Sequence, residues 1–309
     1  MKVTVLRGGP SSEREISLVS GKAVADALRA AGHTVFESDV SPTDLSFLDT
    51  PCDVVFPVLH GQFGESGELQ LILERRGVPF VGSGSEASHT GMDKAATKRR
   101  LESCNIATPG WKLIDLDDPA ALDLAARVGV PCVVKSLRGG SSIDVFLCKR
   151  DEDVAAACQK LSVDMGEVLV EQMVVGTEIT VGILEERALP AIRIDTGGGW
   201  FDFNSKYAAG GARHCLDTGL ADQVVEQATD MALRTHRAVG CRDLSRVDII
   251  VDQADKPWVL EINTMPGFTP RSLLPEAAGK VGYDFPKLCD LLARRAFARG
   301  ADLPRQAVA

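Results

Sequence analysis

The first ninety residues alternate between strand-like and helix-like runs, and this alternation limits the fold more than any other feature of the chain. The runs "VTVLRGG", "HTVFESDV", "CDVVFPVLHG" and "VPFVG" read as strands, and helical segments separate them. The third run is nearly all apolar, as in a strand buried on both faces. Strands joined through helices predict a parallel sheet with right-handed crossovers. Ligands then gather at the carboxyl ends of the strands, here at Gly8-Gly9, His60-Gly61 and Gly82.

The helical run at 13–32 carries apolar residues at helical spacing, at positions 16, 19, 23, 24, 27 and 28. Ser12 followed by Glu15 predicts a capping box at its start, and Gly32 predicts its end.

From about Met92 the pattern changes. A helix leads into a strand, a glycine-rich loop and a strand in "VPCVVKSLRGGSSIDVFLCK". Beyond residue 176 come the hairpin "TEITVGILEERALPAIRI", a glycine-rich stretch, a helix at 221–240, a second hairpin and a final helix. We therefore predict an α/β chain, α+β in parts, with three domains: 1–91, 92–174 and 175–309.

Composition and charge argue against several classes of protein. The chain has 309 residues, 25% charged and 45% hydrophobic, as in ordinary globular proteins. Its net charge of −9 argues against a nucleic acid or an anionic membrane as main partner. Because neither a signal peptide nor a long apolar run is visible, we expect a cytoplasmic protein. The eight cysteines form no C-x-x-C pair and are expected to be reduced core residues, apart from Cys215.

The hairpin "SRVDIIVDQADKPWVLEINTMPG" places acids on strands that are otherwise apolar. If Asp252 faces Pro257 across a four-residue loop, Asp248 lies opposite Glu261. Opposed like charges destabilise a sheet by roughly 0.2–1 kcal/mol. A divalent cation held by these carboxylates and by Asn263 would offset that cost. The alternative is a solvated acidic face.

Three lysines and two residues at strand ends are weaker candidates. Lys135 ends a strand before "SLRGGSS", where backbone N–H groups can hold phosphates, although a plain hairpin turn gives the same pattern. Glu13 either complements a helix dipole or binds an ammonium group. His60 is either a ligand contact or a satisfied turn histidine. Lys94 and Lys206 are equally weak alone, because lone lysines are usually solvated.

Taken together and in order, these residues resemble the D-alanine–D-alanine ligases of the ATP-grasp superfamily. The resemblance covers nearly the whole chain. It is carried by "GGPSSEREISLVSG", "LHGQFGESGELQ", "VPFVGSG", "MDKAATK", "NSKY", "SRVDIIV" and "LEINTMPGFTPRSLLP". It implies a three-domain ATP-grasp fold that binds ATP between two antiparallel sheets. It also implies ligation of two D-alanines through an acyl phosphate, for peptidoglycan precursor synthesis.

The resemblance assigns a role to each candidate residue. It implies catalytic roles for Glu13, Ser141, Tyr207, Arg246 and Gly267. It implies substrate binding by Glu13, His60, Ser272 and Leu273. It implies ATP binding by Lys94, Lys135, Ser142, Glu171, Glu178 and Lys206. It implies two Mg²⁺ ions, or Mn²⁺, at Asp248, Glu261 and Asn263.

Two further inferences follow from the resemblance. Ser141 and Tyr207, linked to Glu13, are expected to latch the loop with "NSKYAAGG" over the site, and Ala208–Gly211 is expected to be mobile without ligand. Tyr207 also favours a dipeptide over a depsipeptide, because related depsipeptide ligases carry histidine there.

Some positions depart from the family pattern. They are Ser136, Leu137, Gly139, Asp144, Gln172 and the run "HCLDTG" at 214–219. These departures leave open an ATP-grasp ligase for another amino-acid pair, or an ATP-binding paralogue without activity. The expected partners are amino acids and ATP, with neither nucleic acid nor membrane, in a homodimer.

Overall fold

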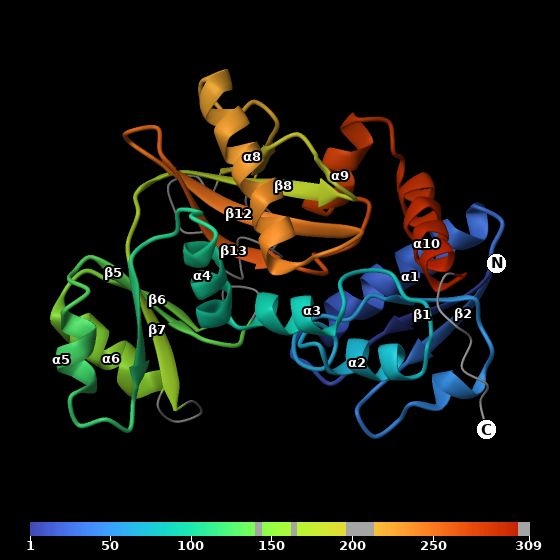
Figure 1. Cartoon of the computed structure of the whole chain (residues 1–309), viewed down its shortest axis with the longest axis horizontal. Coiled ribbons are helices and arrows are strands. Elements are labelled where there is room, and N and C mark those ends of the chain that lie inside the picture. The colour runs from blue at the N-terminus through green and yellow to red at the C-terminus, as the bar shows by residue number, and fades with distance from the viewer. Residues whose placement is uncertain (140–143, 162–165, 196–212, 302–309) are drawn as a thin grey trace.

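The structure, a computed structural model, describes residues 1–139, 144–161, 166–195 and 213–301. In this part of the chain the strands form three sheets. Figure 1 shows them side by side along the longest axis of the molecule, with the sheet of the C-terminal third between the other two. This arrangement confirms the predicted fold class, an α/β chain with one parallel and two antiparallel sheets. The predicted domain boundaries remain a prediction.

The N-terminal sheet is parallel, with strand order β2-β1-β3. The predicted fourth strand is reduced to a single parallel bridge between Val55 and Phe80. The strands of this sheet are β1 (Lys2–Arg7), β2 (Thr34–Asp39) and β3 (Val54–Pro57). The helices of this region are α1 (Arg14–Ala30), the 3₁₀ turn η1 (Ser46–Asp49), α2 (Glu68–Arg75), α3 (Ser85–Met92) and α4 (Lys94–Ser103).

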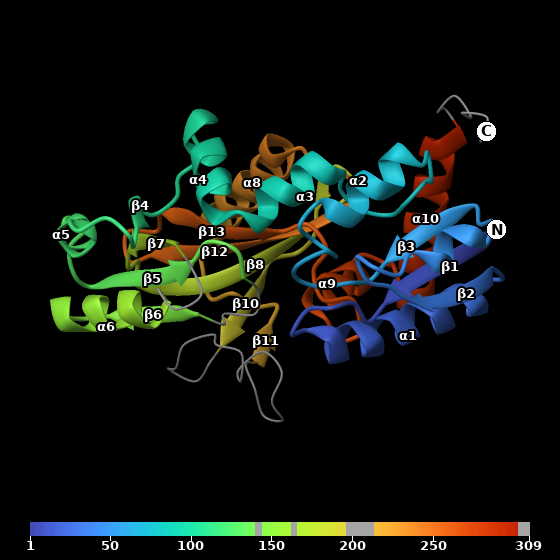
Figure 2. The ribbon, with the colours of Figure 1, turned by 90° about the horizontal axis from the view of Figure 1, so that it is seen from below.

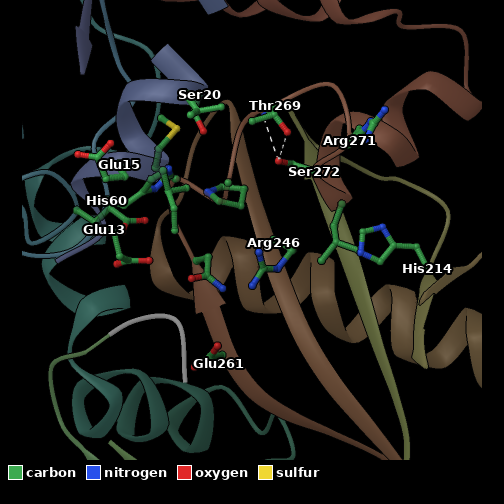
Figure 3. Close-up of a pocket in the computed structure, with 18 residues that line it drawn as sticks. Glu13, Glu15, Ser20, His60, His214, Arg246, Glu261, Thr269, Arg271 and Ser272 are labelled. Atoms are coloured by element: carbon green, nitrogen blue, oxygen red, sulfur yellow. Dashed lines mark hydrogen bonds between the residues drawn. The ribbon is translucent and has the colours of Figure 1, made fainter. Parts of the chain in front are cut away.

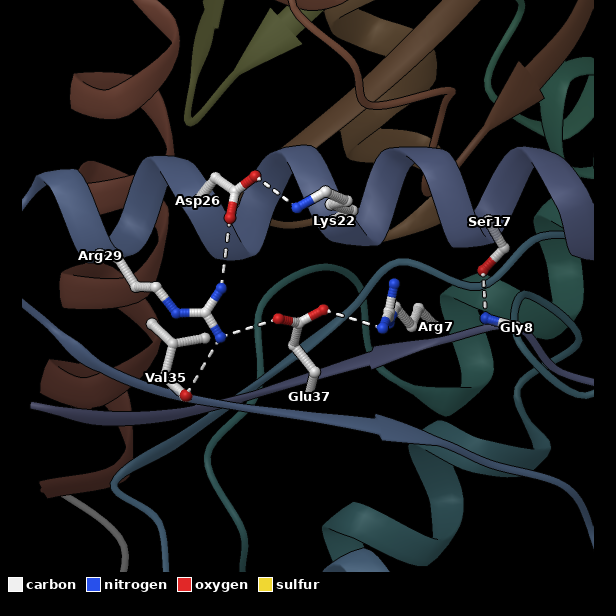
Figure 4. Close-up of polar contacts among 8 residues, drawn as sticks. All are labelled: Arg7, Gly8, Ser17, Lys22, Asp26, Arg29, Val35 and Glu37. Atoms are coloured by element: carbon white, nitrogen blue, oxygen red, sulfur yellow. Dashed lines mark hydrogen bonds and ion pairs between the residues drawn. The ribbon is translucent and has the colours of Figure 1, made fainter.

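Polar contacts fix α1 on this sheet (Figure 4). The Ser17 hydroxyl accepts a hydrogen bond from the Gly8 N–H at 2.9 Å and donates one to the Val58 carbonyl at 2.5 Å. One helical side chain therefore ties together the ends of β1 and β3. Further along the helix, Arg29 pairs with Glu37 of β2 at 2.7 Å. These contacts fix the position of the first turn of α1 relative to the carboxyl ends of the strands.

The central sheet is antiparallel, with strand order β4-β7-β5-β6. Its elements are β4 (Trp111–Asp115), α5 (Ala121–Ala126), β5 (Cys132–Ser136), β6 (Val145–Cys148), α6 (Asp151–Leu161) and β7 (Glu167–Gln172). Cys132, Cys148 and Cys158 lie in the core between this sheet and its helices, as expected. All eight cysteines are free thiols, but Cys104 is exposed and Cys52 is only partly buried, so the core prediction was wrong for these two.

The third sheet is antiparallel, with order β11-β10-β8-β12-β13 and the short β9 paired to β8. The helix α8 covers one of its faces, and α9 packs against β8 (Figures 1 and 2). Its strands are β8 (Gly176–Leu184), β9 (Arg187–Ala188), β10 (Ile192–Asp195), β11 (Arg213–Cys215), β12 (Leu244–Asp252) and β13 (Pro257–Asn263). The helices of this region are α8 (Asp222–Val239), α9 (Leu273–Lys280) and α10 (Phe285–Ala301).

The C-terminal helix α10 returns to the N-terminal sheet and packs against α1 and β3. Apolar residues of α10, such as Leu288 and Leu292, share one core with β1 and α1. A buried carboxylate strengthens this junction. Asp243 accepts hydrogen bonds from Arg299 at 2.6 and 2.8 Å and from the Gly82 N–H at 2.8 Å. Among the helices within the described ranges, none combines the length and apolar character that a membrane span needs.

Candidate active site

A cavity of about 530 Å³ lies where the N-terminal sheet meets the C-terminal third of the chain. Figure 3 shows Glu13 and His60 at one side of it and His214 at the other, with Arg246 between them. Eight of the predicted site residues line this single cavity: Glu13, His60, Arg246, Glu261, Asn263, Gly267, Ser272 and Leu273.

The hairpin β12–β13 places Asp248 and Glu261 opposite each other as predicted, but its turn and its strand register differ from the prediction. Asp248 lies opposite Glu261 and Arg246 opposite Asn263. The turn, however, pairs Val251 rather than Asp252 with Pro257, and a bulge after Asp248 restores the register. A bulge inserts one extra residue in one strand, and here that residue is on β13. The prediction of the turn was wrong, and the pairing of the two carboxylates is confirmed.

The buried carboxylate of Asp248 is held from two directions. Arg246 donates to it at 2.9 Å through Nε and at 2.7 Å through a terminal nitrogen. Thr180 of β8 donates its hydroxyl at 2.6 Å, and the Asn263 amide lies 3.5 Å away. Arg246 therefore supplies positive charge beside the opposed acids. Within the described part of the chain, no three His, Cys, Asp or Glu side chains form a metal cluster. The oxygen donors that the described residues offer at this point include the two carboxylates and the Asn263 amide.

Phe268 anchors the loop between β13 and α9 in the core. This ring is fully buried and lies 5.8 Å from Phe56 and 5.7 Å from Phe285, measured between ring centroids. On the cavity side, the Ser272 hydroxyl accepts from the Thr269 N–H at 2.9 Å. Ser272 also occupies the N-cap position of α9. The buried ring therefore holds a turn whose polar groups face the cavity.

Glu13 and His60 lie together at the carboxyl ends of the N-terminal strands. Glu13, and not Ser12 as predicted, occupies the N-cap position of α1, and its side chain makes no capping hydrogen bond. The predicted capping box of Ser12 and Glu15 was therefore wrong. Burial lowers the pKa of His60, although the Glu13 charge opposes this effect. Among the described residues, Nε2 of His60 is buried without a hydrogen-bond partner. A buried donor or acceptor without a partner is costly, so a ligand atom at this point would lower that cost.

Glu65 was not identified from the sequence. It lines both the large cavity and a smaller one beside Lys94, and it accepts a hydrogen bond from the Gly61 N–H at 2.6 Å. Burial, with a contribution from the charge of Glu13, raises the pKa of Glu65 to about 8. The segment "GQFGESG" indicated a turn, which drew attention to His60. A glutamate inside a glycine-rich turn gives no local signal of burial.

The nucleotide-side candidates surround a buried ion-pair cluster between α4, β5 and β7. Glu171 pairs with Lys135 and, at 2.7 Å, with Lys98. Burial by itself raises the pKa of Glu171, but the two lysines outweigh it and lower that pKa to about 2. Lys98 was also missed, because a lysine on a helix usually reads as solvated. Glu178 and Glu261 also act on the pKa of Lys135, which places both acids within electrostatic reach of that lysine.

Lys94, at the start of α4, contacts one end of the loop "SLRGGSS", and Asp144 lies near its other end. Lys94 donates a hydrogen bond to the Gly139 carbonyl at 2.7 Å and lines the small cavity together with Glu261. Asp144 has a φ of +61°, so the position does need a left-handed backbone, as the departure from glycine suggested. The remaining predicted residues, Ser141, Ser142, Lys206 and Tyr207, lie outside the described residues, as does Ala208–Gly211.

Other residues of the large cavity were not predicted. Ile16 and Val19 belong to the helical apolar spacing of α1, yet they line the cavity, and Val19 is 63% exposed. His214 and Arg271 also line it. The sequence pattern that identified the helix did not distinguish the residues that face the core from those that face the cavity.

The chain has a parallel sheet followed by two antiparallel sheets, and the β12–β13 hairpin of the last sheet carries two carboxylates and an arginine; solved ATP-grasp ligases share this arrangement. Two family models match the chain. They are described as "D-ala D-ala ligase N-terminus", over residues 36–83, and "D-ala D-ala ligase C-terminus", over residues 85–294. The chain belongs to the D-alanine–D-alanine ligase family.

The similarity extends over whole chains. The D-alanine–D-alanine ligase of Gloeobacter violaceus is 41% identical over 299 residues, covering 96% of this chain and 99% of the relative. That of Acidiphilium cryptum is 41% identical over 306 residues, with coverage of 96% and 99%. The crystal structure of the Bacillus anthracis ligase superposes with a TM-score of 0.89 at 30% identity, covering 98% of this chain and 99% of that one. The structure of the same ligase complexed with ATP gives a TM-score of 0.84 at 27% identity, with coverage of 97% and 98%.

Proposed function

We propose that the protein joins two D-alanine molecules at the expense of ATP, giving D-alanyl-D-alanine, ADP and phosphate. The observation that carries this proposal is the composition of the large cavity. Glu13 and His60, at the carboxyl ends of the N-terminal strands, line one space together with Arg246, Glu261 and Asn263 of the β12–β13 hairpin. Family membership and the two full-length relatives support the same reaction. The product would serve peptidoglycan precursor synthesis in the cytoplasm.

The first D-alanine would bind between Glu13 and Arg246. The Glu13 carboxylate suits an ammonium group, and the unsatisfied Nε2 of His60 lies beside it in the same cavity. Arg246 and the N–H of Gly267 would stabilise the tetrahedral oxyanion that forms when the acyl phosphate is attacked. One such donor is worth roughly 2.7–4 kcal/mol.

The nucleotide would bind between the two antiparallel sheets. We assign contacts with its phosphates to Lys94, Lys135, Ser142 and Lys206. We assign contacts with its adenosine to Glu171 and Glu178. The buried ion-pair cluster supports this assignment. Its two lysines, Lys98 and Lys135, outnumber its one carboxylate, Glu171, so it places positive charge here in a chain whose net charge is −9.

Asp248, Glu261 and Asn263 fit Mg²⁺ by the chemistry of their donors. Two opposed carboxylates and an amide supply the hard oxygen ligands that Mg²⁺ prefers, and phosphate oxygens would complete its coordination. When bound, one or two Mg²⁺ ions, or Mn²⁺ in their place, would neutralise charge on the transferring phosphoryl group. Arg246 already offsets part of the repulsion between Asp248 and Glu261, and a bound cation would offset more of it.

The second D-alanine would place its carboxylate at Ser272 and Leu273. The Ser272 hydroxyl is already held by the Thr269 turn, so it is positioned before substrate arrives. Ser141 and Tyr207 would act with Glu13 to close the site, because an acyl phosphate must be protected from water. Tyr207 favours the dipeptide product, and we expect a homodimer.

Phosphate release with Mg-ATP tests this proposal, measured with and without D-alanine and with L-alanine as control. We expect release that depends on D-alanine, together with a dipeptide detected by mass. E261Q should lower this release at least about 100-fold, whereas E226Q, an exposed acid on α8, should not change it. Phosphate release without any dipeptide, or equal rates with L-alanine, would contradict the proposal.

A further inference from the structure

His214 lines the substrate cavity, although it lies in the run "HCLDTG" that departs from the family pattern. It lies on β11, which pairs with β10 through Ile194 opposite His214. Its ring does not move freely. Nδ1 lies 2.7 Å from a carboxylate oxygen of Glu276, and both side chains are about 30% exposed, at 28% and 30%.

The contact with Glu276 shows which part of the cavity His214 belongs to. Glu276 lies on the first turn of α9, where its N–H donates to the Ser272 carbonyl at 2.9 Å. His214 is therefore connected to the turn that presents Ser272 and Leu273. Figure 3 shows the opposite side of the cavity occupied by Glu13 and His60, with Arg246 in between. The imidazole thus lies on the side that we assign to the second amino acid.

From this placement we infer that His214 determines specificity at the second amino-acid subsite. Its ring, held in place by Glu276, forms a wall that restricts the incoming side chain to the size of a methyl group. A longer side chain must displace the ring and break its contact with Glu276. This inference rests on the proposed function, because the subsite exists only if two amino acids are joined.

The test is a competition between D-alanine and D-2-aminobutyrate, which is longer by one methylene. Fragmentation in the mass spectrometer shows which residue of the dipeptide is the larger one, and the C-terminal residue reports the second subsite. Discrimination by one methylene is typically 10-fold or more. H214A should therefore raise the ratio of D-alanyl-D-2-aminobutyrate to D-alanyl-D-alanine about 10-fold. H214W should lower it.

Two further variants control the test. R213A changes the neighbouring residue of the same strand, whose side chain is 81% exposed and does not line the cavity, and should leave the ratio unchanged. E276Q keeps the size of the side chain but loosens the ring, and should give an intermediate ratio. Because each ratio is measured within one reaction, it does not depend on the amount of active protein.

The outcomes separate this inference from the proposed function. Wild-type protein that forms no dipeptide from D-alanine would remove the proposed function itself. Wild-type protein that forms D-alanyl-D-alanine, with an unchanged ratio in H214A, would overturn the assignment of His214. An increase confined to the N-terminal residue of the dipeptide would also overturn it, because the first subsite would then have widened.

Discussion

Replacing Glu171 by glutamine should destabilise the central sheet by about 3 kcal/mol. Glu171 is 2% exposed and lies between Lys98, 1% exposed, and Lys135, 7% exposed. Its pKa of about 2, against an ordinary 4.5, corresponds to about 3 kcal/mol of stabilisation of the charged form. Removing one partner of a buried ion pair typically costs about 3–5 kcal/mol, because the remaining charge stays buried.

Urea unfolding at neutral pH, followed by tryptophan fluorescence, measures this effect. Trp111 on β4 lies directly opposite Glu171 on β7, so its emission reports on the sheet that the substitution weakens. Because the folded pKa is depressed, the contribution is present above pH 4.5 and is lost as the pH falls towards 2. E167Q, at the exposed end of the same strand, is the matched control. A loss below about 1 kcal/mol in E171Q would show that the cluster is solvated and would refute the reasoning.

Three further predictions concern titration and packing. The pKa of Glu65 is raised, so in ligand-free protein the free energy of unfolding should fall by at most about 5 kcal/mol as the pH rises from 4.5 to 8. Chemical unfolding of E65Q should not show this fall. Burial lowers the pKa of His236 to about 4, so the free energy of unfolding should fall by up to about 3 kcal/mol as the pH drops from 6.5 to 4. The same dependence of this free energy on pH in H236Q would contradict the prediction. F268A should cost about 3–5 kcal/mol in thermal or chemical unfolding and should slow ligation at saturating substrate, because Gly267 and Ser272 lose their support.

The fold was predictable where side-chain periodicity is local. The alternation of strands and helices gave the parallel sheet, and strand parity placed Asp248 opposite Glu261 although the turn was read wrongly. Two compensating shifts produced this agreement: a longer turn and a bulge on β13. A bulge has no signature in the alternation itself. The pairing of the acids was therefore better predicted than the path that leads to it.

The site was predictable only in part, and the missed residues share a cause. Lys98 and Glu65 are charged residues in segments that read as exposed. Lys98 is buried and Glu65 is partly buried, because other elements cover them. Val19 has the spacing of a core residue but faces a cavity instead. Burial of this kind depends on how domains pack, which residue spacing along one helix or turn does not encode. The roles of the remaining residues came from the resemblance to the family.

The return of α10 to the N-terminal sheet affects the order in which the protein can become active during synthesis. Leu288 and Leu292 complete a core begun by β1 and α1, and Arg299 closes the junction around Asp243. The cavity takes one wall from each side of this junction. A ribosome that has made only the first 280 residues has therefore produced every cavity residue but not the helix that holds the two walls together. Assembly of the site therefore waits until α10 has been made and can pack against α1 and β3.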